Sequence, residues 1–170
     1  MNKISLYLIT MFGIGNISKM PGTIASFITS ILFLFLFVAE INIYVLLIIF
    51  FVVLVFSPNI IDKNIHQFNN LDPKEIVIDE FIGQSIPCLW ICYKLKVYGM
   101  LGTVASPPLL PSILPFLIAF ISFRFFDILK PFPINLIDKK IKNGFGVVFD
   151  DVVAGIFAAI FTHLLLSLIY

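Results

Sequence analysis

The chain has 170 residues, of which 60% are hydrophobic and 12% are charged, and its mean hydropathy is +1.08. A water-soluble domain of this length cannot bury so much apolar surface, so the composition points to a single domain, 1–170, whose main solvent is the lipid bilayer. The formal net charge of +1 excludes the overall basic field that is typical of nucleic-acid-binding proteins.

The first predicted element is a short apolar run, Ile4–Phe12. We interpret it as a retained interfacial helix, because no small-residue cleavage site of a signal peptide follows it. Small residues and the pair Pro21-Gly22 then form a turn into the first long apolar segment. Thr23, at the start of that segment, is a candidate phosphate ligand together with the amides of a helix start. A simple turn with a helix cap would also explain this pattern.

Five long apolar segments make up most of the chain. Each has roughly 16–19 residues, or roughly 24–29 Å as an α-helix, which is close to the ~30 Å hydrocarbon core of a bilayer. We therefore predict an all-α, polytopic membrane bundle of about five apolar helices. The first two segments are also compatible with a partly re-entrant hairpin. The segments are Ile24–Ala39, Ile41–Phe56, Ile76–Tyr93, Pro107–Phe123 and Val152–Tyr170.

The connections between these segments alternate between two sides of the membrane and differ in charge. One side carries eight basic residues, and the other carries only Lys94 and Lys96. The positive-inside rule puts the basic side in the cytoplasm. Nine of the ten acidic residues fall on or beside the same side, which that rule does not require. We therefore expect one polar site at the cytoplasmic ends of the helices.

The first acidic pair, Asp79-Glu80, follows Asp72, which is suited to cap a helix beginning at Pro73. That helix start would put the pair beyond the first turn and inside apolar sequence. Carboxylates near lipid are costly, so their presence there favours a functional role. Gly83 comes one turn after Asp79 and would let a neighbouring helix approach the acid. The alternative is a first-turn acid cluster matched to the helix dipole.

The second acidic pair, Asp150-Asp151, repeats this spacing because Gly155 follows Asp151 by one helical turn. We expect the two segments to pack together and to pool four carboxylates, which would repel one another without a bound cation. Oxygen ligands of this kind suit Mg²⁺. The simpler alternative is a helix start that Asp150 caps.

A third group, Arg124, Asp127 and Lys130, recurs at every third position and therefore shares one stripe of a helix, which the two following prolines end. Arg124 and Lys130 are candidate phosphate ligands, because a guanidinium binds phosphate through a bidentate fork and an ammonium binds it as a point charge. The alternative is membrane anchoring with an Arg–Asp salt bridge. Asp72 and Asp138 are candidate accessory acids.

Four strings occur in the order and spacing of one known family: PGTIAS (21–26), DPKEIVIDEFIGQ (72–84), FRFFDILKPFPI (123–134) and GFGVVFDDVVAG (144–155). Through them the chain resembles the phosphatidylglycerophosphatase A family of bacterial lipid phosphatases over nearly its whole length. The resemblance implies magnesium-dependent hydrolysis of phosphatidylglycerophosphate to phosphatidylglycerol and inorganic phosphate at the inner membrane. It also puts family motif positions on Asp79, Glu80, Asp127, Lys130, Asp138, Asp150 and Asp151.

We therefore predict a multi-pass enzyme of the bacterial inner membrane that acts on a phospholipid, with its active site facing the cytoplasm. The predicted metal ligands are Asp79, Glu80, Asp150 and Asp151, and the predicted catalytic acids are these four and Asp127. One carboxylate would orient a water molecule or attack phosphorus itself, and both routes remain open. The main alternative is a divalent-cation transporter, because acids within a membrane also mark ion pathways.

Overall fold

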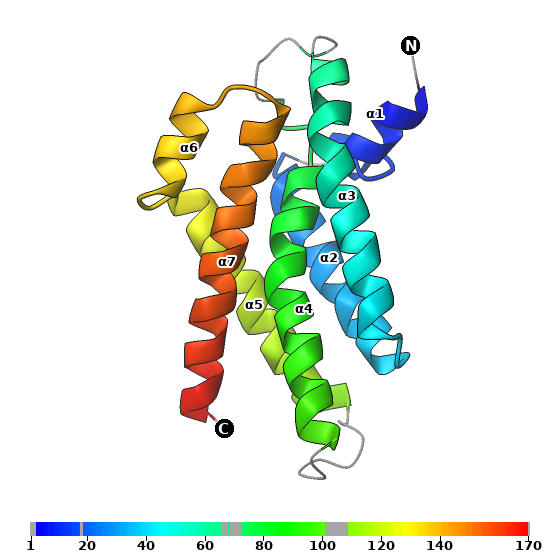
Figure 1. Ribbon diagram of the computed structural model, residues 1–170, viewed down its shortest axis with the longest axis vertical. Helices are drawn as coiled ribbons and strands as arrows, with labels where there is room; N and C mark the ends of the chain where they lie inside the picture. The colour runs from blue at the N-terminus through cyan, green and yellow to red at the C-terminus, as the bar shows by residue number, and fades with distance from the viewer. Residues whose placement is uncertain (1–2, 18, 66–67, 69–72, 101–108, 170) are drawn as a thin grey trace.

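The computed structural model describes residues 3–17, 19–65, 68, 73–100 and 109–169, and every regular element in these ranges is helical (Figure 1), as predicted. Two short helices, α1 (Lys3–Ile9) and α6 (Ile134–Lys140), lie at one end of a bundle of long helices. A 3-10 turn, η1 (Ile14–Asn16), comes between α1 and the first long helix. The long helices are α2 (Pro21–Val38), α3 (Ile43–Asn64), α4 (Ile78–Met100), α5 (Leu109–Leu129) and α7 (Gly144–Ile169).

Three of the described helices, α2, α3 and α7, are long and apolar enough to cross a membrane. Helices α2 and α3 are separate elements of 18 and 22 residues, and α3 continues past Phe56, the predicted end of its segment. The first two segments therefore form two separate helices, each long and apolar enough to cross a membrane. Within the described residues α4 and α5 do not meet the same criterion, so the predicted count of about five apolar helices is not confirmed. Helix α4 carries acidic, basic and amide side chains along its length.

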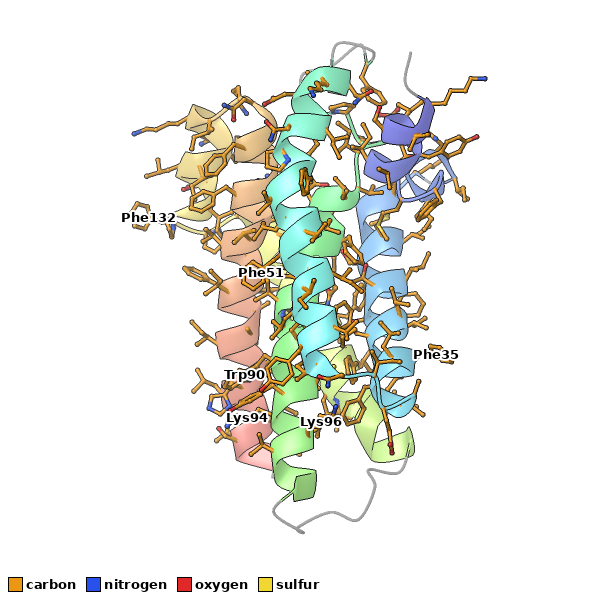
Figure 2. All side chains as sticks on the ribbon, turned by 45° about the vertical axis from the view of Figure 1, so that its right-hand side comes forward. Phe35, Phe51, Trp90, Lys94, Lys96 and Phe132 are labelled. Atoms are coloured by element: carbon orange, nitrogen blue, oxygen red, sulfur yellow. The ribbon has the colours of Figure 1, made fainter. Side chains whose placement is uncertain are left out.

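The outer surface of the bundle is apolar. Figure 2 shows Phe35 and Phe51 pointing away from the helices that carry them, and both side chains are more than half exposed. At the end opposite α6, the ammonium of Lys94 lies 5.1 Å from the ring centre of Trp90. Aromatic and basic side chains are typical of the level where a membrane helix meets the lipid headgroups. The surface therefore suits a lipid environment.

Helix α4 begins at Ile78 and not at Pro73, so the predicted helix start is wrong. The amide of Val77 donates a hydrogen bond of 2.9 Å to the carbonyl oxygen of Ile9 at the end of α1. This long-range contact uses an amide that a continuous helix would bond internally. Asp72, the predicted cap and candidate accessory acid, lies outside the described residues.

These helix starts change the setting of both acidic pairs. Asp79 and Glu80 occupy the first turn of α4, where the positive end of the helix dipole stabilises negative charge. Asp150 lies inside α7 and does not cap it, because the helix already begins at Gly144. The amide of Gly144 instead donates a hydrogen bond of 2.5 Å to Asp62 Oδ1 of α3. Asn143, the residue before the helix, accepts a hydrogen bond of 3.0 Å from the amide of Gly146, so α7 is capped both by its own preceding residue and by a side chain of another helix.

Helix α4 contacts α2, α3, α5 and α7, and its closest approach to α7 depends on two glycines. A Cβ atom on Gly155 would overlap the carbonyl oxygen of Gly83. A Cβ atom on Gly83 would lie 2.7 Å from the carbonyl oxygen of Asp151. The predicted packing of the two acid-bearing segments is therefore confirmed, and it brings Asp79 and Glu80 of α4 close to Asp151 of α7.

Candidate active site

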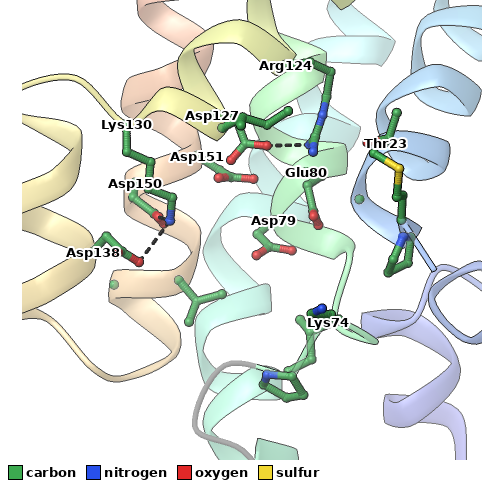
Figure 3. A pocket seen from close by; sticks show the side chains of 18 of the residues that line it. Thr23, Lys74, Asp79, Glu80, Arg124, Asp127, Lys130, Asp138, Asp150 and Asp151 are labelled. Carbon is green, nitrogen blue, oxygen red and sulfur yellow. Dashed lines mark hydrogen bonds and ion pairs between the residues drawn. The ribbon is translucent and has the colours of Figure 1, made fainter. Parts of the chain in front are cut away.

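An open cavity of about 630 Å³ lies where the starts of α2, α4 and α7 meet the end of α5 and the helix α6 (Figure 3). Except for Asp72, every site residue predicted from the sequence lines this cavity, including Thr23. The tertiary structure therefore brings together residues from four separate stretches of the chain. The charged lining residues are Lys19, Lys74, Asp79, Glu80, Arg124, Asp127, Lys130, Asp138, Lys142, Asp150 and Asp151.

Three carboxylates converge inside the cavity, and we call Asp79, Glu80 and Asp151 the acidic trio. Each offers one oxygen atom, and these atoms all lie within 4.8 Å of one another. One oxygen of each residue (Asp79 Oδ1, Glu80 Oε2 and Asp151 Oδ2) is buried without a hydrogen-bond partner in the described part of the chain. A buried carboxylate without a partner is costly, and an oxygen-only donor set fits a hard divalent cation such as Mg²⁺.

Asp150 lies beside the acidic trio but has a different partner. Lys130 Nζ donates hydrogen bonds of 2.6 Å to Asp150 Oδ2 and of 2.9 Å to Asp138 Oδ1. The structure therefore assigns one oxygen of Asp150 to a lysine. The other oxygen, Oδ1, is buried and has no hydrogen-bond partner among the described residues. Asp150 thus keeps one donor atom for a cation.

The contacts of Lys130 also stabilise charge at the cavity rim. Burial disfavours the ammonium, but the hydrogen bonds to Asp150 and Asp138 outweigh burial and raise the pKa of Lys130 above its usual range. Partial burial would raise the pKa of Asp138, but the hydrogen bond from Lys130 outweighs it and lowers that pKa below the ordinary value. Both groups are therefore charged at neutral pH, and Lys130 stays cationic next to the cavity.

Arg124 is held in place from two helices. It forms an ion pair with Asp127, one turn later in α5, and its Nη1 lies 3.5 Å from Ser26 Oγ of α2. The Arg124 Nε atom is buried and has no acceptor in the described part of the chain. In Figure 3 Arg124 and Lys130 lie on either side of Asp151. The predicted stripe of Arg124, Asp127 and Lys130 therefore faces one cavity with two cations.

The start of α2 forms another wall of the cavity. A Cβ atom on Gly22 would overlap Glu80 Oε1 and would lie 3.4 Å from Arg124 Nη1. Glycine at this position therefore lets two charged groups approach the helix start, whose first amides have no partner within the helix. From the sequence, Thr23 was the predicted ligand here and Gly22 was predicted only as part of a turn, whereas Ser26 was given no role. The sequence feature that could have indicated this close approach is the Pro21-Gly22 pair at the start of an apolar segment.

Comparison with known proteins decides the family. A sequence model described as phosphatidylglycerophosphatase A matches residues 7–166. The chain belongs to the phosphatidylglycerophosphatase A family. The matched range includes every charged residue that lines the cavity. The family resemblance carried by the four sequence strings is thereby confirmed.

Two relatives in the phosphatidylglycerophosphatase A family show how far the similarity extends. The phosphatidylglycerophosphatase A of Haemophilus influenzae is 36% identical over 149 residues, which cover 88% of this chain and 80% of the relative. The phosphatidylglycerophosphatase A of Escherichia coli K12 is 33% identical over 88 residues, which cover 52% of this chain and 41% of the relative. No solved structure matches the chain.

Proposed function

We propose that this protein hydrolyses the phosphomonoester of phosphatidylglycerophosphate and releases phosphatidylglycerol and inorganic phosphate. Membership of the phosphatidylglycerophosphatase A family and the names of its relatives support this reaction. One observation on this chain carries the proposal. Two cations, Arg124 and Lys130, flank three carboxylates, each of which has one buried oxygen without a hydrogen-bond partner among the described residues, in a single cavity. That combination suits a phosphate with a divalent cation.

We propose Mg²⁺ as the cofactor, with the acidic trio as its ligands and Asp150 Oδ1 as a further donor. The support is chemical, because these side chains offer buried oxygen atoms that lack hydrogen-bond partners in the described residues. When bound, the ion would screen the phosphate charge and stabilise the negative charge that develops in the transition state.

The two cations of the cavity are proposed to bind the non-bridging phosphate oxygens. Asp127 and Ser26 hold Arg124, and Asp138 and Asp150 hold Lys130. Because these partners already orient the cations, little reorganisation is needed when the phosphate binds. Asp127 then acts through Arg124, and a carboxylate of the trio orients the attacking water or attacks phosphorus itself.

We propose that the protein resides in the bacterial inner membrane with the cavity facing the cytoplasm. The bacterial relatives and the three apolar helices support a membrane location. The orientation rests on charge, because the cavity end of the bundle is rich in lysine whereas Lys94 and Lys96 lie toward the other end (Figure 2).

The alternative of a divalent-cation transporter has no support in the described structure. The acidic trio and Asp150 gather at one end of the bundle, and Arg124 and Lys130 lie among them. An ion pathway would instead need acidic or polar groups through the depth of the membrane. The arrangement fits a binding site for an anionic headgroup better than a path for a cation.

The decisive experiment measures phosphate release from phosphatidylglycerophosphate by the purified protein in detergent, with Mg²⁺ and with EDTA. We expect release that depends on Mg²⁺ and that falls roughly 10²–10⁴-fold in Asp79→Asn and Asp151→Asn. Glu40→Gln, a matched carboxylate-to-amide change outside the cavity, should keep wild-type activity. Full turnover in both Asn variants would refute the site. Metal uptake into proteoliposomes without any phosphate release would refute the enzyme.

A further inference from the structure

The cavity opens into a second hollow that the proposed chemistry does not use. This smaller hollow has a volume of about 480 Å³. Lys19, Pro21 and Lys74 line both hollows, so the two lysines stand at their junction. Figure 3 shows Lys74 on the same side of the cavity as Asp79 and Glu80. The remaining lining residues of the smaller hollow are Gly15, Asn16 and Glu75.

Backbone contacts build the wall that carries these lysines. A Cβ atom on Gly15 of η1 would overlap the carbonyl oxygen of Glu75, so the two segments touch along their main chains. The amide of Ile76 donates a hydrogen bond of 3.0 Å to the carbonyl oxygen of Pro73 and closes the turn that contains Lys74. Lys74 therefore lies in a turn that packs against η1, and Lys19 lies in the connection from η1 to α2.

The charge of the junction differs from that of the deeper cavity. Arg124 and Lys130 each form ion pairs with carboxylates, whereas no ion pair joins Lys19 or Lys74 to a described residue. Both lysines are exposed. Among the described residues that line the smaller hollow, Glu75 is the one carboxylate against two lysines, so these described residues carry a net positive charge. Two ammonium groups of this kind suit a phosphate as point charges.

Exposed apolar side chains flank Lys19 along the chain. Ile17 and Phe12 are 77% and 81% exposed, and Met20, which lines the larger cavity, is exposed as well. Exposed apolar side chains beside basic residues are typical of segments that lie in the interfacial layer of a membrane. The lysine pair thus lines the same cavity as the acidic trio, and exposed apolar side chains adjoin Lys19 in the sequence.

The substrate of the proposed reaction carries, in order, a terminal phosphomonoester, glycerol, a bridging phosphodiester and diacylglycerol. We propose that Lys19 and Lys74 bind the bridging phosphodiester while the terminal phosphate lies at the acidic trio. This inference rests on the proposed function and adds a basis for substrate choice. Phosphatidic acid has a phosphomonoester attached directly to diacylglycerol and no phosphodiester, so the lysine pair favours the lipid with two phosphates.

The phosphodiester is unchanged by the reaction, so the lysine pair is expected to affect KM and not kcat. Contacts that are equally strong in the bound substrate and in the transition state lower KM and leave kcat unchanged. The product phosphatidylglycerol retains the phosphodiester, so it should compete with the substrate through the same two lysines. Both effects can be measured separately from the chemical step.

The test compares phosphatidylglycerophosphate with phosphatidic acid as substrates in mixed micelles containing Mg²⁺. For the double variant Lys19→Gln/Lys74→Gln we expect KM for phosphatidylglycerophosphate to rise roughly 10-fold while kcat stays within about twofold. Hydrolysis of phosphatidic acid should not change, and inhibition by phosphatidylglycerol should weaken about as much as KM rises. Lys140→Gln, a matched control on α6 that lines neither hollow, should keep the wild-type constants.

Each other outcome overturns the inference in a distinguishable way. Unchanged KM and unchanged product inhibition in the double variant would refute the lysine pair and leave the proposed function intact. Loss of kcat on both lipids would mean that the lysines act at the reacting phosphate. A rise in KM in Lys142→Gln alone would put the phosphodiester beside the α6–α7 connection. Phosphate release from neither lipid by the wild-type protein would refute the proposed function, and the inference with it.

Discussion

Gly83 of α4 and Gly155 of α7 lie against each other, with the carbonyl oxygen of Gly83 in the space that a Cβ atom on Gly155 would need. Each glycine follows an acid of the trio by one helical turn, Asp79 in α4 and Asp151 in α7. The approach of the two backbones therefore sets the distance between carboxylates that are far apart in the sequence. Packing between helices positions the proposed metal ligands.

The change Gly155→Ala should push α7 away from α4. We expect a loss of stability of roughly 1–3 kcal/mol from overpacking and a large loss of phosphatase activity, because the trio is pulled apart. Thermal unfolding in detergent and phosphate release measure the two effects. Ile156→Ala, on a partly exposed position of the same helix, should alter neither quantity strongly. Wild-type stability and activity in Gly155→Ala would contradict the glycine contact.

The change Gly22→Ala should act mainly on the site and less on stability. The added methyl group would overlap Glu80 Oε1, which is the end of a flexible side chain and can move aside. We expect the Mg²⁺ concentration for half-maximal activity to rise roughly 10-fold, because one ligand of the trio is displaced. Ile31→Ala, on an exposed position of α2, is the control. An unchanged Mg²⁺ dependence would argue against Glu80 as a ligand.

The change Arg124→Lys should reduce kcat/KM roughly 10–100-fold although it conserves the positive charge. The guanidinium pairs with Asp127 and reaches Ser26 while keeping further N–H groups for a phosphate, and a lysine cannot reproduce this fork. Steady-state kinetics on phosphatidylglycerophosphate measure the effect. Near wild-type kinetics would show that only the charge of Arg124 matters.

The change Lys130→Met should destabilise the protein by roughly 1–3 kcal/mol at neutral pH, because it leaves a buried carboxylate of Asp150 unpaired. At each pH, the difference in the free energy of unfolding between wild type and Lys130→Met measures the stabilisation that the ion pairs of Lys130 provide. Thermal unfolding measured at several pH values therefore shows over which pH range these ion pairs stabilise the fold.

The lowered pKa of Asp138 means that its share of this stabilisation is present above about pH 4 and is lost as the pH falls through the folded-state value. The raised pKa of Lys130 means that its share is present below about pH 10 and is lost as the pH rises through the folded-state value. The part of the difference between wild type and Lys130→Met that Asp138 contributes should be lost only in acid, below about pH 4. An Asp138→Asn variant that loses its stability difference from wild type already at neutral pH would contradict this pairing.

The change Asp62→Ala should remove the cap that α3 supplies to α7. Its carboxylate accepts the hydrogen bond from the amide of Gly144, and loss of a helix cap costs about 1 kcal/mol. We expect a lower unfolding temperature with an intact acidic trio, so Mg²⁺ dependence should stay close to wild type. Lys63→Gln, the neighbouring control, should leave the unfolding temperature unchanged. A wild-type unfolding temperature in Asp62→Ala would rule out the cap.

The sequence by itself determined the helical class, the family and nearly all charged residues of the site. Apolar segments long enough for a bilayer and carboxylates near lipid can be recognised within single segments, because both depend on local composition. The recurrence of a glycine one turn after Asp79 and after Asp151 also predicted which helices pack. These features need no knowledge of distant contacts.

Only the tertiary structure decided where α4 begins and how the acids are shared. The amide of Val77 bonds to Ile9, and Asp62 accepts a hydrogen bond from the first amide of a helix that begins 82 residues later in the chain. Lys130 takes one oxygen of Asp150, so that the acidic trio excludes this residue although it adjoins Asp151. Each of these partners comes from another element of the fold. Their proximity depends on how whole helices pack, and that packing cannot be predicted from the local sequence pattern.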